Sequence, residues 1–353
     1  MRFVTIAGHP TRRAQAALAV SLLIVSMIIT GILPRFAGDA RWLPGSVALA
    51  QELTPVTVAL DWYPNANHAG LYLAQARGYF TEAGLAVELY TPADPTTVLQ
   101  TVAAGRDTFG ISYQTDVLLA RAEEIPVVSV AALVQRPLLG IMVLDESQIA
   151  RPGDLAGLTI GYPGIPSQEA YLATMLAADG LTMDDVELVN IGYELVPALI
   201  AGRVDASLGS YWTHETILAE GEGYPVDILR VDEWGVPPYY ELVLVASEER
   251  IGQDPDLVSA FLGAVQRGYD AAIADPEAAL DALAAASPEL AREVEAEGIA
   301  LLAPVWTEDV PAFGVQTSDR WETYAAWMAE NDLIPPDLAV EAAFTTDLLP
   351  EPE

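Results

Sequence analysis

From Pro55 onward, short runs of β-branched and apolar residues alternate with amphipathic stretches whose apolar residues recur at helical spacing. Strands favour the first pattern and helices the second. Gly78 follows the first amphipathic stretch, at a position where helices commonly end. The alternation predicts βαβ units, in mainly parallel sheets with helices on both faces. In the first half of the chain the predicted order is strand 56–61, helix 68–77, strand 86–90, helix 96–104, strand 108–112, helix 115–122 and strand 127–133.

A second series of the same kind runs from Leu158 to about Arg230, and the remainder of the chain is mostly helical. In that remainder one apolar stripe recurs every four residues, at Leu257, Phe261, Val265 and Tyr269. Such spacing predicts a helix with one face packed on a core.

The two series share a short repeat. Ala104-Gly105-Arg106 precedes a strand-like run ending at Tyr113, and Ala201-Gly202-Arg203 precedes one ending at Tyr211. The repeat fits either chance similarity between βα units or two similarly built lobes. In the second case each lobe places a tyrosine at the carboxyl end of a strand, the edge where open α/β sheets bind ligands; the alternative is a rim tyrosine with a solvated hydroxyl. The threonines that follow, Thr115 and Thr213, are predicted to cap helices.

The N-terminus has the pattern of a targeting segment. Arg12 and Arg13 precede an apolar run over 14–33, and small residues follow up to Ala50. This is the order of the charged, hydrophobic and cleavage regions of a secretory signal. The apolar run is also close to the ~20 residues that span a bilayer. Residues 1–50 are therefore either a signal peptide cleaved near Ala50 or a retained anchor, and both place the remainder outside the cytoplasm.

The charge balance excludes one class of partner. The 353 residues include 16 basic and 50 acidic residues, every basic residue is arginine, and the net charge is −34. Nucleic acid needs a basic footprint, which is missing here. Mutual repulsion favours a monomer, and the acidity also fits a salty habitat or a biased genome.

Two missing residue types exclude several chemistries. The chain has no cysteine, so disulfides, thiol nucleophiles, cysteine-ligated zinc and a lipid-modified N-terminal cysteine are ruled out. It also has no lysine for a Schiff base or a phosphate-binding loop. We expect neither a cofactor nor a bound metal.

Three sequence stretches point to a known family. They are Leu60–Tyr72 (LDWYPNANHAGLY), Arg77–Leu85 (RGYFTEAGL) and Arg151–Gly161 (RPGDLAGLTIG). These stretches resemble the substrate-binding proteins of sulfonate, nitrate and thiamine-precursor ABC importers. The resemblance covers 56–246 and, more loosely, the helical remainder.

Within that family, three further stretches resemble the formylaminopyrimidine-binding members: 162–171, 211–215 and 234–242. Eukaryotic pyrimidine synthases share the fold of these proteins but carry a cysteine-rich motif. Since this chain has no cysteine, the resemblance does not support that enzymatic activity.

The resemblance implies an α/β type II periplasmic-binding-protein fold, in which two α/β lobes joined by two crossover strands close on a ligand. The strand-like segments Met142–Asp145 and Leu242–Ala246 are the predicted crossovers. Lobe 1 would then comprise 54–143 and 246–353, and lobe 2 would comprise 144–245.

An aminopyrimidine needs an aromatic face to stack on and hydrogen-bonding groups along its edge. Trp62 follows the first predicted strand and precedes loop-forming residues, so its indole fits the stacking role, with a core-capping tryptophan as the alternative. Glu215 fits the polar anchor, because a carboxylate can accept from an exocyclic amine in a charge-assisted bond. The alternative for Glu215 is a solvated residue at a helix start.

The remaining expected ligand-binding residues lie in or beside the stretches that carry the resemblance. Ser167 fits a helix cap as well as a ligand contact, Tyr240 fits either the cleft or the hinge, and each histidine has a structural alternative. The set comprises Asn65, Asn67, His68, Tyr113, Gln114, Tyr162, Ser167, Tyr171, Tyr211, His214 and Tyr240.

The sequence thus predicts a monomeric extracytoplasmic binding protein of an ABC importer that traps an aminopyrimidine and docks on a permease. Only the N-terminal segment or the permease would link it to a membrane. One rival is an enzyme that uses His68, His214 and Glu215 as acid and base. Another is an anion-binding relative with amides at the helix starts near Thr115 and Thr213, which the negative charge opposes. A third is a membrane-tethered sensor domain.

Overall fold

The computed structural model describes residues 52–192 and 194–350. The predicted signal peptide or anchor, residues 1–50, lies outside this part of the chain. Within the described residues, none of the helices combines the length and apolarity that a membrane span requires.

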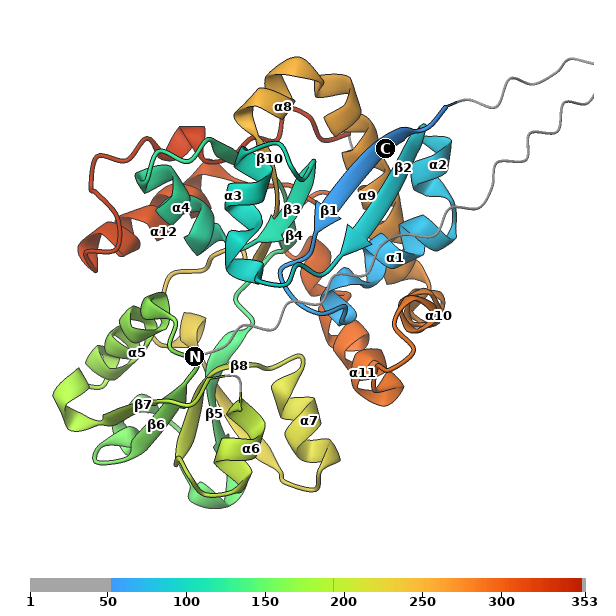
Figure 1. Ribbon diagram of the computed structural model, residues 1–353. Coiled ribbons are helices and arrows are strands. Elements are labelled where there is room, and N and C mark those ends of the chain that lie inside the picture. Colours follow the sequence, from blue (N-terminus) through green and yellow to red (C-terminus); the bar gives the residue numbers. More distant parts are fainter. Residues whose placement is uncertain (1–51, 193, 351–353) are drawn as a thin grey trace, which may run out of the picture. The chain divides into compact units, whose positions relative to one another are not determined.

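Two five-stranded mixed sheets organise the described chain (Figure 1). The first has the order β2-β1-β3-β10-β4 and the second the order β7-β6-β8-β5-β9. The first sheet contains β1 (Thr54–Ala59), β2 (Leu85–Tyr90), β3 (Phe109–Ser112), β4 (Val127–Val134) and β10 (Leu242–Ser247). The second contains β5 (Leu139–Leu144), β6 (Thr159–Tyr162), β7 (Glu187–Asn190), β8 (Ala206–Tyr211) and β9 (Val226–Arg230).

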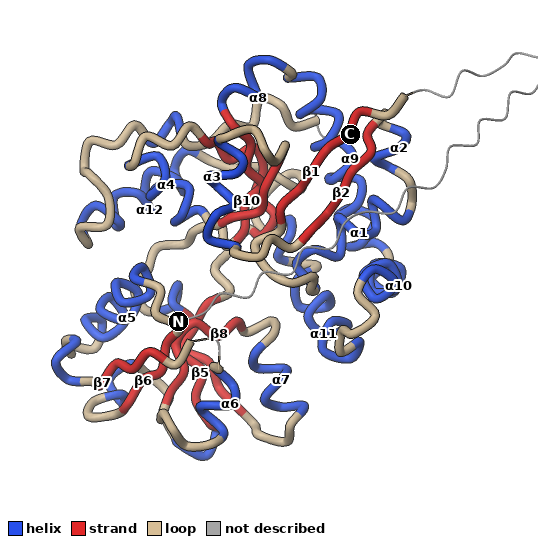
Figure 2. The backbone as a smooth tube through the Cα atoms, viewed as in Figure 1, coloured by secondary structure: helices blue, strands red, loops and turns tan. Residues whose placement is uncertain are grey.

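Helices flank the strands of both sheets (Figure 2). We call lobe 1 the first sheet with α1–α4 and α8–α12, and lobe 2 the second sheet with α5–α7. The helices are α1 (Ala69–Ala76), α2 (Tyr79–Glu82), α3 (Val98–Ala103), α4 (Gln114–Ala122), α5 (Pro166–Ala178), α6 (Leu195–Ile200), α7 (Glu215–Gly221), α8 (Glu248–Gln253), α9 (Pro255–Ala274), α10 (Pro276–Ala286), α11 (Arg292–Leu302) and α12 (Ser318–Glu330). This arrangement confirms the predicted α/β class with two lobes.

The two sheets repeat one topology. In each, three neighbouring strands run parallel, and one antiparallel strand enters from the other sheet: β10 follows β9, and β5 follows β4. The short sequence repeat lies at equivalent places, before β3 and before β8. Its glycines, Gly105 and Gly202, both have positive φ, 67° and 64°. Similarly built lobes, and not chance, therefore explain the repeat.

The predicted crossover positions are wrong by several residues. Met142–Asp145 lies mostly in β5 and Leu242–Ala246 lies in β10, and each of these strands pairs fully within its new sheet. The chain actually passes between the sheets at 135–138 and 231–241, so β5 belongs to lobe 2. Both passages contain proline, which cannot donate to a strand ladder. Strand-like composition marked the strands that follow each passage, and not the passages themselves.

The two connecting segments are fastened to each other. Arg136 in the first segment forms an ion pair with Asp232 in the second, at 2.7 Å. The Leu138 amide also donates to Glu241 Oε2 at 2.7 Å. These contacts hold the hinge side of the lobes together.

The predicted apolar stripe lies on α9, which covers the sheet of lobe 1. Phe261 stacks on Phe109 of β3 with ring centroids 4.1 Å apart. Tyr269 packs on Gly70 so closely that an added Cβ there would come within 2.7 Å of the ring. The Tyr269 hydroxyl also donates to the Asn67 carbonyl at 2.7 Å. The helical return of lobe 1 therefore braces the loop that follows β1.

The predicted threonine caps are wrong. The cap positions of α4 and α7 are Tyr113 and His214, and neither side chain makes a capping hydrogen bond. Thr115 lies inside the first turn of α4, and its hydroxyl contacts Tyr171 and Tyr324. Thr213 precedes the cap of α7, and its buried hydroxyl has no partner among the described residues.

Candidate functional site

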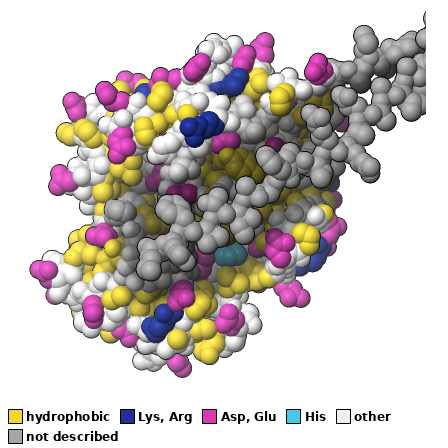
Figure 3. Space-filling model, in the orientation of Figure 1, with side chains coloured by type: hydrophobic (Ala, Val, Ile, Leu, Met, Phe, Trp, Pro, Cys, Tyr) yellow, Lys and Arg dark blue, Asp and Glu magenta, His cyan; other side chains and the backbone are white. Residues whose placement is uncertain are grey.

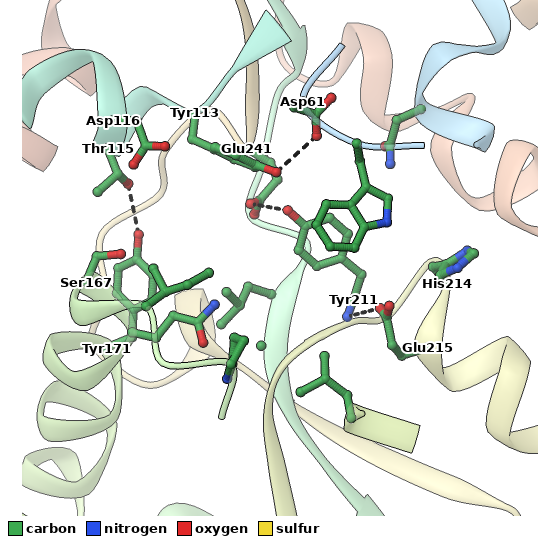
Figure 4. A pocket seen from close by; sticks show the side chains of 18 of the residues that line it. Asp61, Tyr113, Thr115, Asp116, Ser167, Tyr171, Tyr211, His214, Glu215 and Glu241 are labelled. Atoms are coloured by element: carbon green, nitrogen blue, oxygen red, sulfur yellow. Dashed lines mark hydrogen bonds between the residues drawn. The ribbon is translucent and has the colours of Figure 1, made fainter. Parts of the chain in front are cut away.

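A cavity of about 190 Å³ lies between the two lobes (Figure 4). Lobe 1 contributes residues after β1 and β3. Lobe 2 contributes residues after β6, residues in and after β8, and the first residues of β5 and α6, and the second connecting segment contributes two. The lining residues are Asp61, Trp62, Asn65, Asn67, Tyr113, Thr115, Asp116, Leu139, Pro163, Ile165, Ser167, Gln168, Tyr171, Leu195, Gly209, Tyr211, His214, Glu215, Tyr239 and Glu241. Since the parallel strands of both sheets point their carboxyl ends at it, the cavity occupies the usual ligand position of α/β sheets.

Most of the predicted site residues meet at this cavity. The lining includes Trp62, Asn65, Asn67, Tyr113, Ser167, Tyr171, Tyr211, His214 and Glu215. They come from loops, strand ends and helices that lie far apart in the sequence, and the fold brings them together.

Four predicted residues do not line the cavity. Gln114 is fully buried, and its Oε1 accepts from the Tyr240 amide at 2.7 Å. Tyr240 belongs to the second connecting segment, and its hydroxyl accepts from the Thr317 amide at 2.8 Å, which supports the hinge alternative. Tyr162 turns its hydroxyl to Glu169 at 2.8 Å. His68, the fourth, lies behind the cavity wall.

His68 positions a carboxylate that does line the cavity. Its ring is fully buried, and Nδ1 accepts from the Asn65 amide at 3.2 Å. The proton of the neutral ring is therefore on Nε2, which donates to Asp61 Oδ1 at 2.9 Å. Asp61 Oδ2 accepts from the Tyr113 hydroxyl at 3.0 Å. Burial, followed by the nearby Asp61 charge, raises the pKa of Tyr113 well above its ordinary value, so this phenol stays a donor.

The loop that carries Trp62 is rigidly held. Asn65 caps the short 3-10 helix Ala66–His68 by accepting from the Asn67 amide at 2.9 Å. Glu295 of α11 accepts from the Ala66 amide at 2.6 Å. The Trp62 and Tyr63 rings meet edge to face at 6.1 Å. An indole on such a braced loop can offer a fixed stacking surface, because little side-chain or loop freedom remains to be lost on binding.

Glu215 opens helix α7 and faces the cavity. Its Oε2 accepts from the Tyr211 amide at 2.8 Å, and the backbone amide of Glu215 itself also favours the carboxylate. Burial raises the pKa of Glu215, and the neighbouring His214 opposes that shift. Glu215 is thus at a helix start, as in the alternative to the polar-anchor role. However, its side chain lies on the cavity wall and not in open solvent.

Glu241 is a central residue that the sequence did not single out. It is 3% exposed, and it accepts from the Leu138 amide, the Tyr211 hydroxyl at 2.8 Å and the Tyr239 hydroxyl at 3.2 Å. Burial raises its pKa to about 7. Glu241 lies within the stretch 234–242 that carried the family resemblance, but only the fold shows that it meets Tyr211.

Asp116 and Gln168 are two further residues that sequence reasoning missed. Asp116 lies in the first turn of α4, and burial raises its pKa to about 6. Gln168 lies in α5, is 6% exposed, and its Oε1 has no partner among the described residues. An acidic residue in a first turn is common on ordinary surface helices, so the sequence carried no signal for Asp116.

Tyr171 lines the cavity, but its hydroxyl is engaged elsewhere. It lies 2.9 Å from Thr115 Oγ1 and 2.6 Å from the Tyr324 hydroxyl. Its ring also stacks on Trp327, with centroids 5.4 Å apart. Tyr171 therefore contributes a buried side chain to the cavity lining while its hydroxyl joins the lobes.

A sequence model of the family described as NMT1/THI5 like matches residues 65–279. The chain belongs to that family. The formylaminopyrimidine-binding protein of Halalkalibacterium halodurans is 38% identical over 300 residues, which cover 84% of this chain and 91% of that protein. The 4-amino-5-hydroxymethyl-2-methylpyrimidine phosphate synthase of Aspergillus parasiticus is 32% identical over 236 residues, covering 64% of this chain and 69% of that enzyme.

Solved structures confirm the fold of this NMT1/THI5-like protein. The periplasmic aliphatic sulphonate-binding protein SsuA of Escherichia coli has a TM-score of 0.67 at 16% identity, covering 82% of this chain and 96% of SsuA. At that identity the likeness shows the shared periplasmic-binding-protein architecture and nothing about the ligand.

The cavity of this NMT1/THI5-like chain is acidic. Asp61, Asp116, Glu215 and Glu241 line it, and neither arginine nor lysine does. On the face in view, acidic side chains are also more frequent than basic ones (Figure 3). The described residues contain no group of histidine, aspartate and glutamate side chains that could hold a metal ion. The site is therefore suited to binding hydrogen-bond donors or cations, because an anion would find no counter-charge.

Proposed function

We propose that this protein is the extracytoplasmic solute-binding component of an ABC importer and that its ligand is an aminopyrimidine precursor of thiamine. One observation carries the proposal: an interlobe cavity lined by an indole, tyrosine rings and acceptor groups, with no arginine or lysine. A flat heterocycle with exocyclic amines supplies the matching face and donors. The similarity to the formylaminopyrimidine-binding protein supports this ligand class.

The mechanism would be closure on the ligand. Lobe 1 supplies Trp62, lobe 2 supplies Glu215, and a molecule that contacts both stabilises the arrangement in which the lobes meet. A ligand shifts such an equilibrium only through contacts that the open form lacks. The closed protein, a monomer outside the cytoplasm, would then dock on the membrane permease of the importer. Export or anchoring would depend on the N-terminal segment.

An enzymatic role has less support from the site. His214 and Glu215 are sequence neighbours at a helix start, and His68 is sealed behind Asp61. The similarity to a pyrimidine phosphate synthase keeps the reaction worth testing directly. An anion-binding role is opposed by the four carboxyl groups of the cavity.

Calorimetric titration and thermal shift with a matched panel test the proposal. The panel contains N-formyl-4-amino-5-aminomethyl-2-methylpyrimidine, an alkanesulfonate and nitrate, at neutral pH. We expect heat, thermal stabilisation and a change in tryptophan fluorescence with the pyrimidine alone, and no conversion of it on prolonged incubation. Binding of the sulfonate or nitrate in place of the pyrimidine would overturn the ligand class, and turnover would overturn the assignment as a binding protein.

A further inference from the structure

The four carboxyl groups of the cavity differ in how far the protein itself satisfies them. Both oxygens of Asp61 are engaged, by His68 and Tyr113. Both oxygens of Glu241 are engaged as well, by Leu138, Tyr211 and Tyr239. These two carboxyl groups shape the wall and have little acceptor capacity left for a ligand.

Asp116 stands apart from these two. It lines the cavity from lobe 1 and accepts no hydrogen bond from any described residue. Figure 4 shows Asp116 with Thr115 and Ser167 at one end of the cavity, and His214 with Glu215 at the other. The cavity thus has a carboxyl group with free acceptor capacity at each end, one from each lobe.

Gln168 adds an independent sign that a donor belongs in the cavity. Its side chain is only 6% exposed, yet its Oε1 finds no donor among the described residues. Asn67 Oδ1 is also buried and without a partner in the same part of the chain. A buried acceptor left unsatisfied destabilises the protein, so a ligand bearing several N–H groups would relieve that cost.

We propose that Asp116 is a second, specificity-determining anchor, which binds an amino-bearing arm of the ligand at the end of the cavity opposite Glu215. This inference rests on the proposed function and adds the chemistry of the arm. Glu215 would take the amine on the ring, while Asp116 takes the N–H of the substituent. A ligand spanning both ends also links α4 of lobe 1 to α7 of lobe 2.

The arm's charge decides the order of preference. An ionised Asp116 attracts a protonated aminomethyl group through its charge as well as through the hydrogen bond. A hydroxymethyl arm of nearly the same size lacks that charge. A phosphate ester would place negative charge beside Asp116, with no arginine or lysine on the cavity wall to compensate. Burial raises the pKa of Asp116 to about 6, so the carboxylate is ionised at mildly alkaline pH.

Titration of wild-type protein and Asp116→Asn with three pyrimidines tests this assignment. The probes are 4-amino-2-methylpyrimidines with an aminomethyl, a hydroxymethyl or a phosphorylated hydroxymethyl group at ring position five, measured by calorimetry at about pH 8, above the pKa of Asp116. The wild type should prefer the aminomethyl compound. Asp116→Asn should weaken that compound by roughly tenfold or more and the hydroxymethyl compound by roughly threefold or less. Asp256 is an exposed residue of α9, away from the cavity, so Asp256→Asn is the control for the lost charge. It should leave the ratio of the affinities for the aminomethyl and hydroxymethyl compounds unchanged.

The outcomes separate the two proposals. If the wild type binds neither these three pyrimidines nor the N-formyl compound, the proposed function fails and this inference fails with it. If the wild type binds them and the preference for the aminomethyl arm is the same in Asp116→Asn, only the role of Asp116 is overturned. If Asp116→Asn has a low melting temperature, Asp116→Ser replaces it, because serine has neither the carboxyl group of aspartate nor the amide of asparagine. We expect the same decrease in the ratio of the affinities for the aminomethyl and hydroxymethyl compounds.

Discussion

The hydroxyl groups of Tyr171 and Tyr324 lie 2.6 Å apart and join α5 of lobe 2 to α12 of lobe 1. Thr115 Oγ1 completes the cluster, 2.6 Å from the Tyr324 hydroxyl and 2.9 Å from that of Tyr171. All three side chains are buried. Three hydroxyls that each donate once and accept once can satisfy one another only when the lobes are together. The cluster is therefore a contact specific to the closed arrangement.

Tyr324→Phe should weaken ligand binding, although Tyr324 does not itself line the cavity. The substitution keeps the ring and removes two hydrogen bonds, of which the one to Tyr171 crosses the lobes, for a cost of about 1 kcal/mol, or roughly fivefold in affinity. Most of the change should appear as faster ligand release, because the closed state loses stability. Stopped-flow fluorescence with a bound aminopyrimidine measures this rate. If Tyr324→Phe lowers the melting temperature but leaves the release rate unaltered, the cluster serves folding and not closure.

Glu215→Gln should reduce the affinity for an aminopyrimidine by about 1–3 kcal/mol, the usual effect of weakening a buried polar partner. Glutamine can still accept from the Tyr211 amide, so the start of α7 should remain intact. Glu220→Gln, on the exposed face of the same helix, is the matched control for the lost charge. Calorimetry on both variants measures the effect, and equal affinity in Glu215→Gln and wild type would remove Glu215 from the binding site.

The sequence predicts the local elements of this fold well and its long-range contacts poorly. Helix 115–122 and strand 127–133 differ from α4 and β4 by one residue, since apolar periodicity reports local burial directly. The crossovers were misplaced because β5 and β10 have the same composition whichever sheet they join. Trp62 was accessible to sequence reasoning as an aromatic residue after a strand. Asp116 and Glu241 were not, because their significance arises from burial by segments distant in the chain.

Glu241→Gln should make the protein's stability less dependent on pH. Burial raises the pKa of Glu241 from 4.5 to about 7 in the folded protein, so the folded state holds this proton more tightly than the unfolded chain. The resulting stabilisation is fully present below about pH 4.5 and is lost as pH rises through about 7. The difference between the pKa values of the unfolded and folded states corresponds to about 3 kcal/mol of unfolding free energy. Glutamine does not titrate, so its advantage over wild type should grow with pH.

Urea unfolding at about pH 5 and about pH 8 gives the unfolding free energies of the wild type and Glu241→Gln. The pH effects of all other titratable groups are the same in both proteins, so they cancel when the two free energies are subtracted. Glutamine can accept from the Leu138 amide with its oxygen and donate to the Tyr211 hydroxyl with its nitrogen, so the wall should keep its shape. Parallel changes in the two unfolding free energies would show that Glu241 is already ionised in the folded protein.

Gly298→Ala should hinder closure at the end of the cavity away from the tyrosine cluster. A Cβ added at Gly298 on α11 would lie 2.9 Å from Ala66 Cβ and 3.0 Å from the Thr213 carbonyl oxygen of lobe 2. Lobe 2 can avoid the contact with Thr213 by moving away, and this weakens any ligand that must contact both lobes. The contact with Ala66 lies within lobe 1 and must be relieved by a small local shift there. The affinity for ligand should fall several-fold. The free energy of unfolding should change less, because alanine gains about 1 kcal/mol in helix propensity over glycine.

Gly263→Ala in α9 is the matched control for this substitution. The nearest heavy atom to an added Cβ there, on Pro350, is 3.5 Å away, an ordinary contact. It should gain the helix propensity and bind ligand as the wild type does. Small-angle scattering with and without the aminopyrimidine compares the compaction of the two variants. If Gly298→Ala compacts and binds as Gly263→Ala does, the close approach of α11 to Thr213 does not limit closure, and the lobes must meet with more clearance than these distances imply.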